Sequence, residues 1–231
     1  MYLDAATHRS VINLLNMKIF LDTADYEAIA ERYKTGLVDG ITTNPTLVRK
    51  SGVDYVEFIK TLATNFAFES ISAEVEGDSC FEMLTNAIKY RDIGEKVTIK
   101  LPLTVEGLKA CKELTAQGVE TNVTLCFSAA QAIMAAKAGA TYISPFVGRL
   151  NDNSISGVEL VRAISGLYCA HGVRTKILAA SLRDVHHVSR CFLYGASVCT
   201  LPPAVFDKMY NHVLTDSGLA IFEKDFKEIN G

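Results

Sequence analysis

The sequence has no long apolar run and no strong excess of charge of either sign, and each absence excludes a class of protein. No stretch approaches the ~18 consecutive apolar residues that a membrane span requires. The early run Val11–Leu15 is too short for the core of a signal peptide. The 23 basic and 26 acidic residues leave a net charge of −3, which is not typical of a general nucleic-acid binder. We therefore expect a soluble cytoplasmic protein that binds neither nucleic acid nor membranes.

Motifs for metals, disulfides and nucleotides are also missing. The six cysteines form no C-x-x-C pair, and no histidine stands at a zinc-finger offset from them, so we expect small buried hydrophobes in a reducing compartment. The adjacent pair His186-His187 lies in a helical pattern, where neighbouring side chains point about 100° apart and do not share a metal easily. Neither a G-x-G-x-x-G fingerprint nor a P-loop occurs, which removes the usual support for nucleotide binding.

Glycine, in contrast, is placed regularly. The 49% apolar and 21% charged composition excludes disorder and low-complexity arrays, and 231 residues suit a single α/β domain. Glycines such as Gly118 and Gly139 follow helix-like segments and precede strand-like ones, as in αβ loops whose helix ends on a left-handed residue. They recur every ~20–30 residues apart from one interval about twice as long, which is the period of a βα repeat with one marker missing.

Eight short β-branched or apolar segments between these markers are predicted to be strands, each followed by a helical pattern of about 10–15 residues. One such pattern is Phe81, Leu84, Ala87 and Ile88. The predicted strands are Lys18–Asp22, Gly40–Thr43, Ile71–Val75, Val97–Leu101, Glu120–Leu125, Tyr142–Ser144, Lys176–Ala179 and Ser197–Leu201.

This alternation predicts an α/β fold, a compact (β/α)₈ TIM barrel, with a doubly wound sheet as the alternative. We expect residues 1–16 to be an N-terminal appendage and residues 17–231 to form one barrel domain with a C-terminal helix.

Polar residues gather at the predicted carboxyl ends of the strands, where barrel enzymes carry their chemistry. Lys100 is the clearest signal, because it stands among apolar and β-branched neighbours in Val97–Pro102. Burial lowers the pKa of a lysine, and a neutral amine is a nucleophile suited to forming a Schiff base with a carbonyl. The alternative for Lys100 is a buried structural pair with a glutamate.

Two arginines, Arg149 and Arg183, follow the sixth and seventh predicted strands. Late loops of these barrels commonly bind phosphate, and the planar guanidinium fork matches phosphate oxygens. Each arginine alone is more often a solvated surface charge, but the pair, with Ser181 just before Arg183, favours a phosphate-bearing substrate.

Seven segments, in order along the chain from Met17 to near the C-terminus, carry a resemblance to one known family. They are Phe20–Asp25, Thr42–Thr46, Ala73–Val75, Val97–Pro102 with Thr104–Leu108, Asn122–Thr124 with Ala129–Gln131, Ser144–Arg149 and Ala180–Arg183. In these segments the sequence resembles the short, single-domain transaldolases, a family that also contains the fructose-6-phosphate aldolases. One departure is Leu182, where the family often has Phe.

The resemblance implies a role for each matching residue and implies that no metal or organic cofactor is needed. Lys100 would form the Schiff base with a ketose, and Asp22 would take the proton whose loss starts C–C cleavage. Glu74 and Thr124 would hold the water that relays protons. The remaining residues would bind the dihydroxyacetone portion or the phosphate: Thr42, Asn44, Asn122, Ser144, Phe146, Arg149, Ser181 and Arg183.

The branch of the family is suggested by two positions, Glu74 and Phe146, which the aldolase branch typically occupies with Gln and Tyr. Both residues here favour a transaldolase, which transfers a dihydroxyacetone unit between phosphorylated sugars of the pentose phosphate pathway. A fructose-6-phosphate aldolase and a catalytically silent phosphosugar-binding barrel are the alternatives. Short members of the family commonly form rings of subunits, often a decamer, and the apolar residues of Leu219–Phe226 suit such a homo-oligomer.

Overall fold

The computed structural model describes residues 17–230, and their eight parallel strands close into a barrel in chain order, β1 pairing with both β2 and β8. The predicted (β/α)₈ barrel is confirmed, and a doubly wound sheet is excluded because such a sheet has two free edges. Every predicted strand agrees with the observed one to within one residue at each end. The strands are β1 Lys18–Asp22, β2 Gly40–Thr42, β3 Ser70–Glu74, β4 Val97–Pro102, β5 Thr121–Cys126, β6 Tyr142–Pro145, β7 Lys176–Ala179 and β8 Val198–Leu201.

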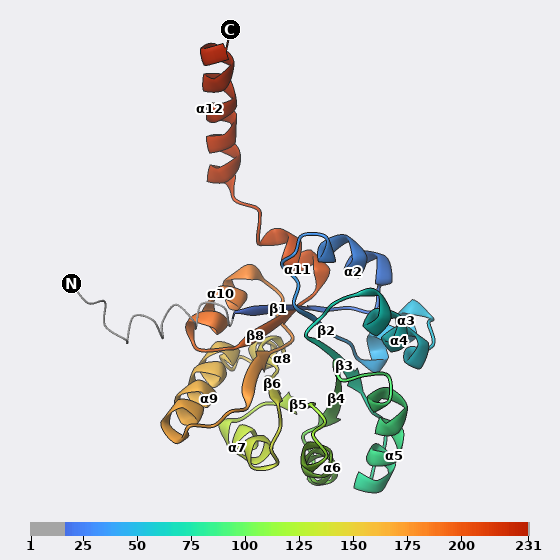
Figure 1. Ribbon diagram of the computed structural model, residues 1–231. Coiled ribbons are helices and arrows are strands. Elements are labelled where there is room, and N and C mark those ends of the chain that lie inside the picture. The colour runs from blue at the N-terminus through green and yellow to red at the C-terminus, as the bar shows by residue number, and fades with distance from the viewer. Residues whose placement is uncertain (1–16, 231) are drawn as a thin grey trace, which may run out of the picture.

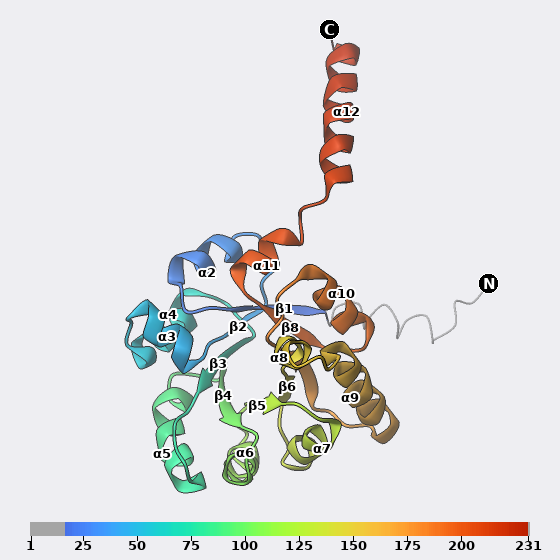
Figure 2. The ribbon, with the colours of Figure 1, turned by 180° about the vertical axis from the view of Figure 1, so that it is seen from behind.

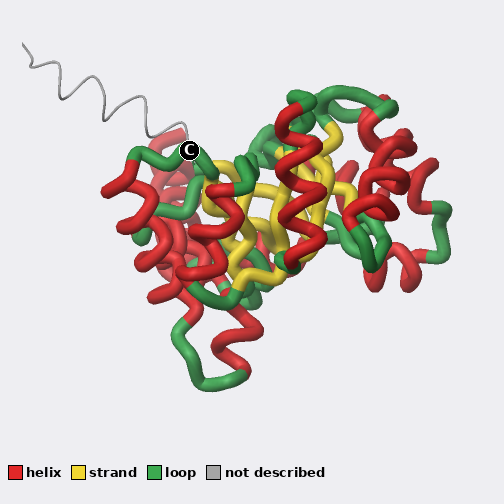
Figure 3. The backbone as a smooth tube through the Cα atoms, turned by 90° about the horizontal axis from the view of Figure 1, so that it is seen from below, coloured by secondary structure: helices red, strands yellow, loops and turns green. Residues whose placement is uncertain are grey.

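Helices surround the barrel on its outside, as Figure 1 and the reverse view in Figure 2 show. In the view from below, the strands lie inside a layer of helices (Figure 3). The helices are α2 Tyr26–Tyr33, α3 Pro45–Ser51, α4 Tyr55–Asn65, α5 Cys80–Arg91, α6 Val105–Ala116, α7 Ala129–Lys137, α8 Val147–Asp152, α9 Gly157–His171, α10 Val185–Leu193, α11 Pro203–Lys208 and α12 Val213–Asn230.

Side chains along the strands alternate between an apolar outer layer and the barrel interior, which is polar toward the carboxyl ends of the strands. In β3, Ile71 and Ala73 are buried within the core shared by the barrel and its helices, whereas Ser70 and Ser72 lie on the opposite strand face. The same two-residue period places Glu74 inward at the strand end. The barrel interior is therefore lined at its carboxyl end by one set of alternate residues from the eight strands.

Apolar side chains fill the barrel interior next to its polar end. Phe20, Tyr142, Leu178 and Val198 form a small separate core, in which the rings of Phe20 and Tyr142 meet edge to face at 6.2 Å. Gly40 makes room for this plug, since an added Cβ would lie 2.6 Å from the Ser70 carbonyl oxygen and 2.7 Å from the Phe20 ring. The polar end is thereby separated from solvent on the far side.

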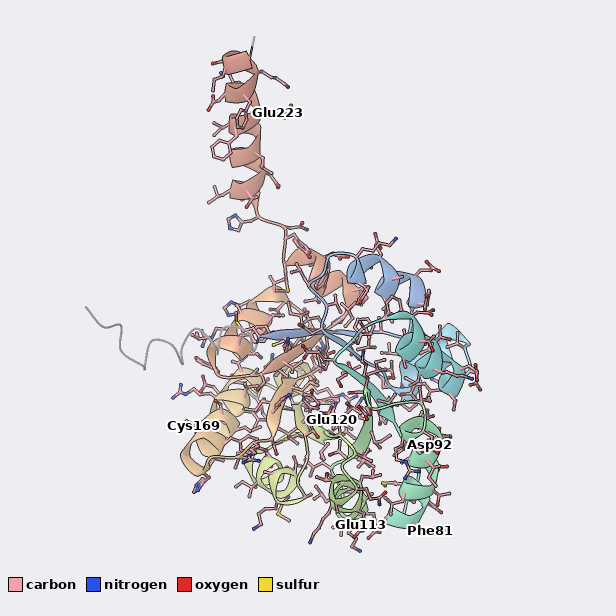
Figure 4. All side chains as sticks on the ribbon, in the orientation of Figure 1. Phe81, Asp92, Glu113, Glu120, Cys169 and Glu223 are labelled. Atoms are coloured by element: carbon pink, nitrogen blue, oxygen red, sulfur yellow. The ribbon has the colours of Figure 1, made fainter. Side chains whose placement is uncertain are left out.

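The predicted helix near residue 81 is present, but its apolar pattern does not mark the buried face. In α5 the buried residues are Met83, Ala87 and Tyr90. Phe81 is 78% exposed and points outward in Figure 4, and Ile88 is also exposed. A capping box between Ser79 and Glu82 sets the start of α5, so local hydrogen bonds as well as the apolar pattern define the helix.

The long glycine interval reflects a β2–β3 connection with two helices instead of one. Gly52 follows α3 in the left-handed conformation with φ 71°, whereas Phe66, the residue that follows α4, is extended, so this helix end needs no glycine.

The C-terminal helix α12 stands away from the barrel in both ribbon views. No helix among residues 17–230 is both long and apolar enough to cross a bilayer. The predicted appendage, residues 1–16, lies outside the described residues.

Candidate active site

A polar cavity of about 120 Å³ lies at the carboxyl end of the barrel. All predicted site residues except Glu74 and Arg183 line it, and Leu178, Ala180 and Thr200 complete the wall. The predicted residues that the fold brings together here are Asp22, Thr42, Asn44, Lys100, Asn122, Thr124, Ser144, Phe146, Arg149 and Ser181.

Lys100 reaches into this cavity from β4, and only 8% of its side chain is exposed. Its Nζ lies 2.9 Å from Glu74 Oε2 and donates a hydrogen bond of 3.1 Å to the Thr43 carbonyl. Glu74 and Lys100 are register partners on neighbouring strands, so the ion pair follows directly from the pairing of β3 with β4. The amine thus has fixed partners on two sides.

Asp22 ends β1 and is held by a chain of hydroxyl groups. Thr42 Oγ1 donates to Asp22 Oδ1 at 3.0 Å and lies 2.7 Å from Thr200 Oγ1. Burial raises the pKa of the Asp22 carboxyl above its ordinary value, although the charge of Lys100 and the hydrogen bond from Thr42 both lower it. A carboxylate with a raised pKa is a better proton acceptor than an ordinary aspartate.

Two asparagines carry amide groups to the cavity under different constraints. Asn122 is fully buried, accepting from Ser144 Oγ at 2.7 Å and donating to Ser72 Oγ at 3.3 Å. Asn44 is the N-cap of α3, where its Oδ1 accepts from the Leu47 amide at 3.0 Å. This leaves the amino group of Asn44 as its available polar function.

Thr124 is the buried polar group of the cavity that lacks a partner: its Oγ1 makes no hydrogen bond within residues 17–230. The β5–β6 register shifts between Val123 and Cys126, with Leu125 at φ 64°, so a bulge follows Thr124 directly. Bulges commonly redirect side chains beside active sites. A buried hydroxyl of this kind can bond a substrate or water at little cost.

The opposite wall is built from the β6–α8 and β7 ends. The Arg149 guanidinium lies 4.8 Å from the centre of the Phe146 ring, and Ser181 adopts the left-handed conformation with φ 59°. The Gly148 amide donates to the Ser181 carbonyl at 3.0 Å, so α8 approaches this segment closely. A strained non-glycine residue at such a junction is typical of a functional site.

Arg183 is close to this wall but does not line the cavity. Both terminal nitrogens of its guanidinium pair with the Asp152 carboxylate of α8, the Nη2–Oδ2 distance being 2.6 Å. A Cβ placed on Gly148 would be 3.0 Å from both Arg183 Nε and Ser181 Oγ. The Nε edge of Arg183 therefore faces the same point as Ser181, while Asp152 holds its other end.

The sequence analysis did not predict two residues of the site, Thr200 and Tyr55. Thr200 of β8 lines the cavity, and the signal for it is a polar residue at an inward position of an otherwise apolar strand. Tyr55 of α4 contacts Thr43 and the Glu74 backbone from outside the barrel, and no sequence pattern marks it.

The chemistry of the site is that of an amine, two carboxylates, the guanidinium of Arg149 and neutral hydroxyl and amide groups. No three histidine, cysteine, aspartate or glutamate side chains among residues 17–230 converge as metal ligands would. A larger groove of about 780 Å³ lies outside the barrel beside α7 and α9 and contains none of the predicted residues. The arrangement suits covalent catalysis at a carbonyl by Lys100.

Comparison with known proteins agrees with this geometry. The chain is 51% identical over 212 residues to a probable transaldolase of Dinoroseobacter shibae, covering 92% of this chain and 97% of that protein. It is 50% identical to a probable transaldolase of Hyphomonas neptunium, with 92% and 98% covered, and 48% identical to one of Bartonella henselae, with 92% and 97% covered. The family model described as transaldolase/fructose-6-phosphate aldolase matches residues 19–230. The chain therefore belongs to the transaldolase/fructose-6-phosphate aldolase family.

Proposed function

We propose that this protein is a transaldolase that moves a dihydroxyacetone unit between phosphorylated sugars through a Schiff base on Lys100. The observation that carries the proposal is the buried Lys100 amine, 2.9 Å from Glu74, in a cavity that Asp22, Arg149 and neutral polar groups also line. The donors would be fructose 6-phosphate and sedoheptulose 7-phosphate, and the acceptors erythrose 4-phosphate and glyceraldehyde 3-phosphate. The names of the three relatives support the same activity.

The first step is imine formation. Lys100 Nζ attacks the C2 carbonyl of the ketose, and the carbinolamine loses water to give a protonated imine. In this proposal Glu74, beside the amine, and Thr124, with its unpartnered hydroxyl, hold the water that carries protons to and from the carbinolamine oxygen.

The second step is cleavage. Asp22 takes the proton of the C4 hydroxyl, the C3–C4 bond breaks, and its electron pair moves into the imine to form an enamine. The departing aldehyde is glyceraldehyde 3-phosphate when fructose 6-phosphate is the donor. The raised pKa of Asp22 suits a general base. Addition of the enamine to a second aldehyde reverses these steps and completes the transfer.

Substrate binding is assigned to the surrounding polar groups. Thr42, Asn44, Asn122 and Ser144 would hold the hydroxyls of the dihydroxyacetone portion, and the amide and hydroxyl groups facing the cavity fit this role. The phosphate would lie at the opposite wall, bound by Arg149, Ser181 and Arg183.

Trapping with sodium borohydride tests the central step. Borohydride reduces the imine to a secondary amine, so incubation with fructose 6-phosphate should leave a stable adduct on Lys100, located by mass spectrometry of peptides. Lys100→Met should give no adduct and no turnover while remaining folded, since no neighbouring group replaces the covalent amine. A wild-type protein without an adduct would leave only phosphosugar binding.

Phe146 favours transfer over simple release of dihydroxyacetone. Its ring lies against Phe127 at 5.8 Å and under the Arg149 guanidinium, and it lines the cavity without a proton to donate. The enamine should therefore persist until an acceptor aldehyde arrives. Fructose 6-phosphate should turn over much faster with erythrose 4-phosphate than without it.

Phe146→Tyr provides the matched variant, because a phenol at this position can deliver the proton that releases free dihydroxyacetone. We expect it to raise cleavage in the absence of an acceptor, with Glu74→Gln adding to the effect. Equal rates with and without an acceptor in the unmodified protein would identify an aldolase instead.

The remaining parts of the proposal concern the whole chain. All residues given a role lie between Asp22 and Arg183, so we propose that residues 17–231 form the catalytic domain and that removal of residues 1–16 leaves turnover unchanged. Phosphorylated sugars do not cross membranes freely, which favours a cytoplasmic location. The exposed apolar residues of α12 favour a homo-oligomer.

A further inference from the structure

One tyrosine outside the barrel contacts the groups that surround the Lys100 amine. Tyr55 is the first residue of α4, and its hydroxyl lies 2.6 Å from Thr43 Oγ1 and 2.9 Å from the Glu74 amide nitrogen. Oxygen atoms of both Thr43 and Glu74 contact Lys100 Nζ. The Tyr55 hydroxyl is therefore hydrogen-bonded to both Thr43 and Glu74.

The directions of these hydrogen bonds are fixed by the available protons. Thr43 Oγ1 donates to the Ser72 carbonyl at 3.1 Å, so it accepts from the Tyr55 hydroxyl. The phenol oxygen in turn accepts from the Glu74 amide. Each hydroxyl proton has one acceptor. The hydrogen bonds therefore run from the Glu74 amide of β3 through the Tyr55 and Thr43 hydroxyls to the Ser72 carbonyl, also of β3.

The hydrogen bonds of Tyr55 lie at the point where β2 and β3 stop pairing. The last register pair between β2 and β3 is Thr42 with Ser72, and beyond it the two strands no longer pair. The Glu74 amide therefore has no backbone acceptor on β2, and the phenol of Tyr55 takes that place. Without it, the ends of β2 and β3 beside the amine would be joined less firmly.

We infer that Tyr55 is a positioning residue for the Schiff-base reaction: it fixes the Thr43 carbonyl and the Glu74 backbone and so orients the Lys100 amine toward the ketose carbonyl. It is not a catalytic residue, since it does not line the cavity. The inference rests on the proposed function of Lys100. A misplacement of about 1 Å at a reacting group can cost a hundredfold in rate.

The phenol acts as a neutral hydrogen-bonding group. Burial raises its pKa above the ordinary value for tyrosine, which keeps its proton in place for Thr43 at any working pH. The ring packs on Tyr90 with centroids 5.4 Å apart, so the aromatic contact holds the side chain independently of its hydroxyl.

The variant Tyr55→Phe removes the hydroxyl and keeps the ring. We expect kcat for transfer from fructose 6-phosphate to fall about tenfold to a hundredfold, while KM stays within about twofold because Tyr55 does not line the cavity. The rate of imine formation, followed by rapid quenching into borohydride, should fall by the same factor as kcat or more.

Tyr90→Phe is the matched control. It removes a hydroxyl from the same aromatic pair but leaves Thr43 and Glu74 untouched, so kcat, KM and the trapping rate should equal those of the unmodified protein. Thr43→Val is the second variant: it removes the acceptor of the phenol, should lower kcat in the same way, and replaces Tyr55→Phe if that protein does not fold.

The outcomes are distinct. An active protein whose Tyr55→Phe variant keeps the wild-type kcat and trapping rate would overturn the inference alone. A rise in KM equal to the fall in kcat would indicate general loosening of the site and would also overturn it. An unmodified protein that forms no borohydride adduct would overturn the proposed function and this inference with it.

Discussion

At the scale of single residues, the site combines a buried amine with carboxylates in different surroundings. Glu74 is paired directly with Lys100 at 2.9 Å, whereas Asp22 is held by Thr42 and has its pKa raised by burial. Carboxylates in unlike surroundings can divide acid and base work between them. Burial of Asp22 disfavours its charged form, which is the form that accepts a proton.

Asp22→Asn should abolish turnover and yet make the protein more resistant to heat at pH 7. The folded state raises the pKa of Asp22, so it binds the proton more tightly than the unfolded chain does. Stability due to this group is present at low pH and is lost as the pH rises from the ordinary value of 3.8 through the raised folded pKa. The neutral amide avoids that loss and keeps an acceptor for Thr42.

Thermal melting of both proteins from about pH 4 to pH 8 checks this expectation. The difference in melting temperature should shrink toward acid pH, where the wild-type carboxyl is protonated in both states. An asparagine variant that melts below the wild type at pH 7 would show that the carboxylate stabilises the fold on balance.

Arg183→Ala should raise KM for fructose 6-phosphate about tenfold or more, since a hydrogen bond between charged groups contributes roughly 1.5–3 kcal/mol. The loss also leaves the Asp152 carboxylate without its guanidinium partner, and we expect this negative charge to repel the phosphate. Adding Asp152→Asn to Arg183→Ala should therefore recover part of the affinity.

Steady-state kinetics with phosphorylated and unphosphorylated donors test this pair. Dihydroxyacetone as donor should be used equally well by all three proteins. If Arg183→Ala impairs both donors alike, the arginine does not hold phosphate, and if the double variant recovers nothing, Asp152 does not face it.

At the scale of elements, the proposed phosphate wall depends on how closely α8 approaches the end of β7. The Val147 and Gly148 amides donate to the Ala180 and Ser181 carbonyls at 3.0 Å each. A Cβ on Gly148 would lie 2.1 Å from the Ser181 carbonyl oxygen. Only glycine allows this approach, which brings Arg149 and Ser181 to one wall.

Gly148→Ala should push these two elements apart. We expect a higher KM for phosphorylated sugars and a lower melting temperature, because overpacking costs about 1–3 kcal/mol, or roughly 2–4 °C per kcal/mol for a chain of this size. Gly166→Ala in α9 is the control, since a Cβ there meets no atom within 4 Å and alanine favours helix. Equal behaviour of the two variants would contradict the role of the close approach.

At the scale of the whole molecule, the closed barrel faces all the proposed catalytic groups to one end, while α12 projects from it (Figure 1). Leu219, Phe222, Phe226 and Ile229 repeat at helical spacing along α12, and each is at least 61% exposed. An apolar stripe of this length on a projecting helix is typical of a contact surface.

Light scattering should find a multimer at micromolar concentration, and removal of residues 213–231 should reduce the measured mass. The buried apolar stripe would supply the association energy that the shortened chain lacks. A monomeric full-length protein, or an unchanged mass after the removal, would contradict this role of α12.

Much of the fold follows from order along the chain. Strand positions were predictable because short β-branched or apolar segments lie between glycines that end the preceding helices, and both signals are local properties of the chain. The sequence also singled out Lys100 inside a predicted strand, but it left open whether this lysine was a nucleophile or one partner of a buried pair with a glutamate. The resemblance to a family then assigned roles to Lys100 and Glu74.

The features that the sequence did not predict depend on segments that come together only in the folded barrel. The buried face of α5 was not visible in its apolar pattern, since exposed Phe81 carries the same signal as a core residue. The Asp152–Arg183 pair and the contacts of Tyr55 join residues on different elements. These contacts form only when the barrel closes and the ends of β2 and β3 separate. The local pattern of the sequence does not show which side chain will lie between two strands that have separated.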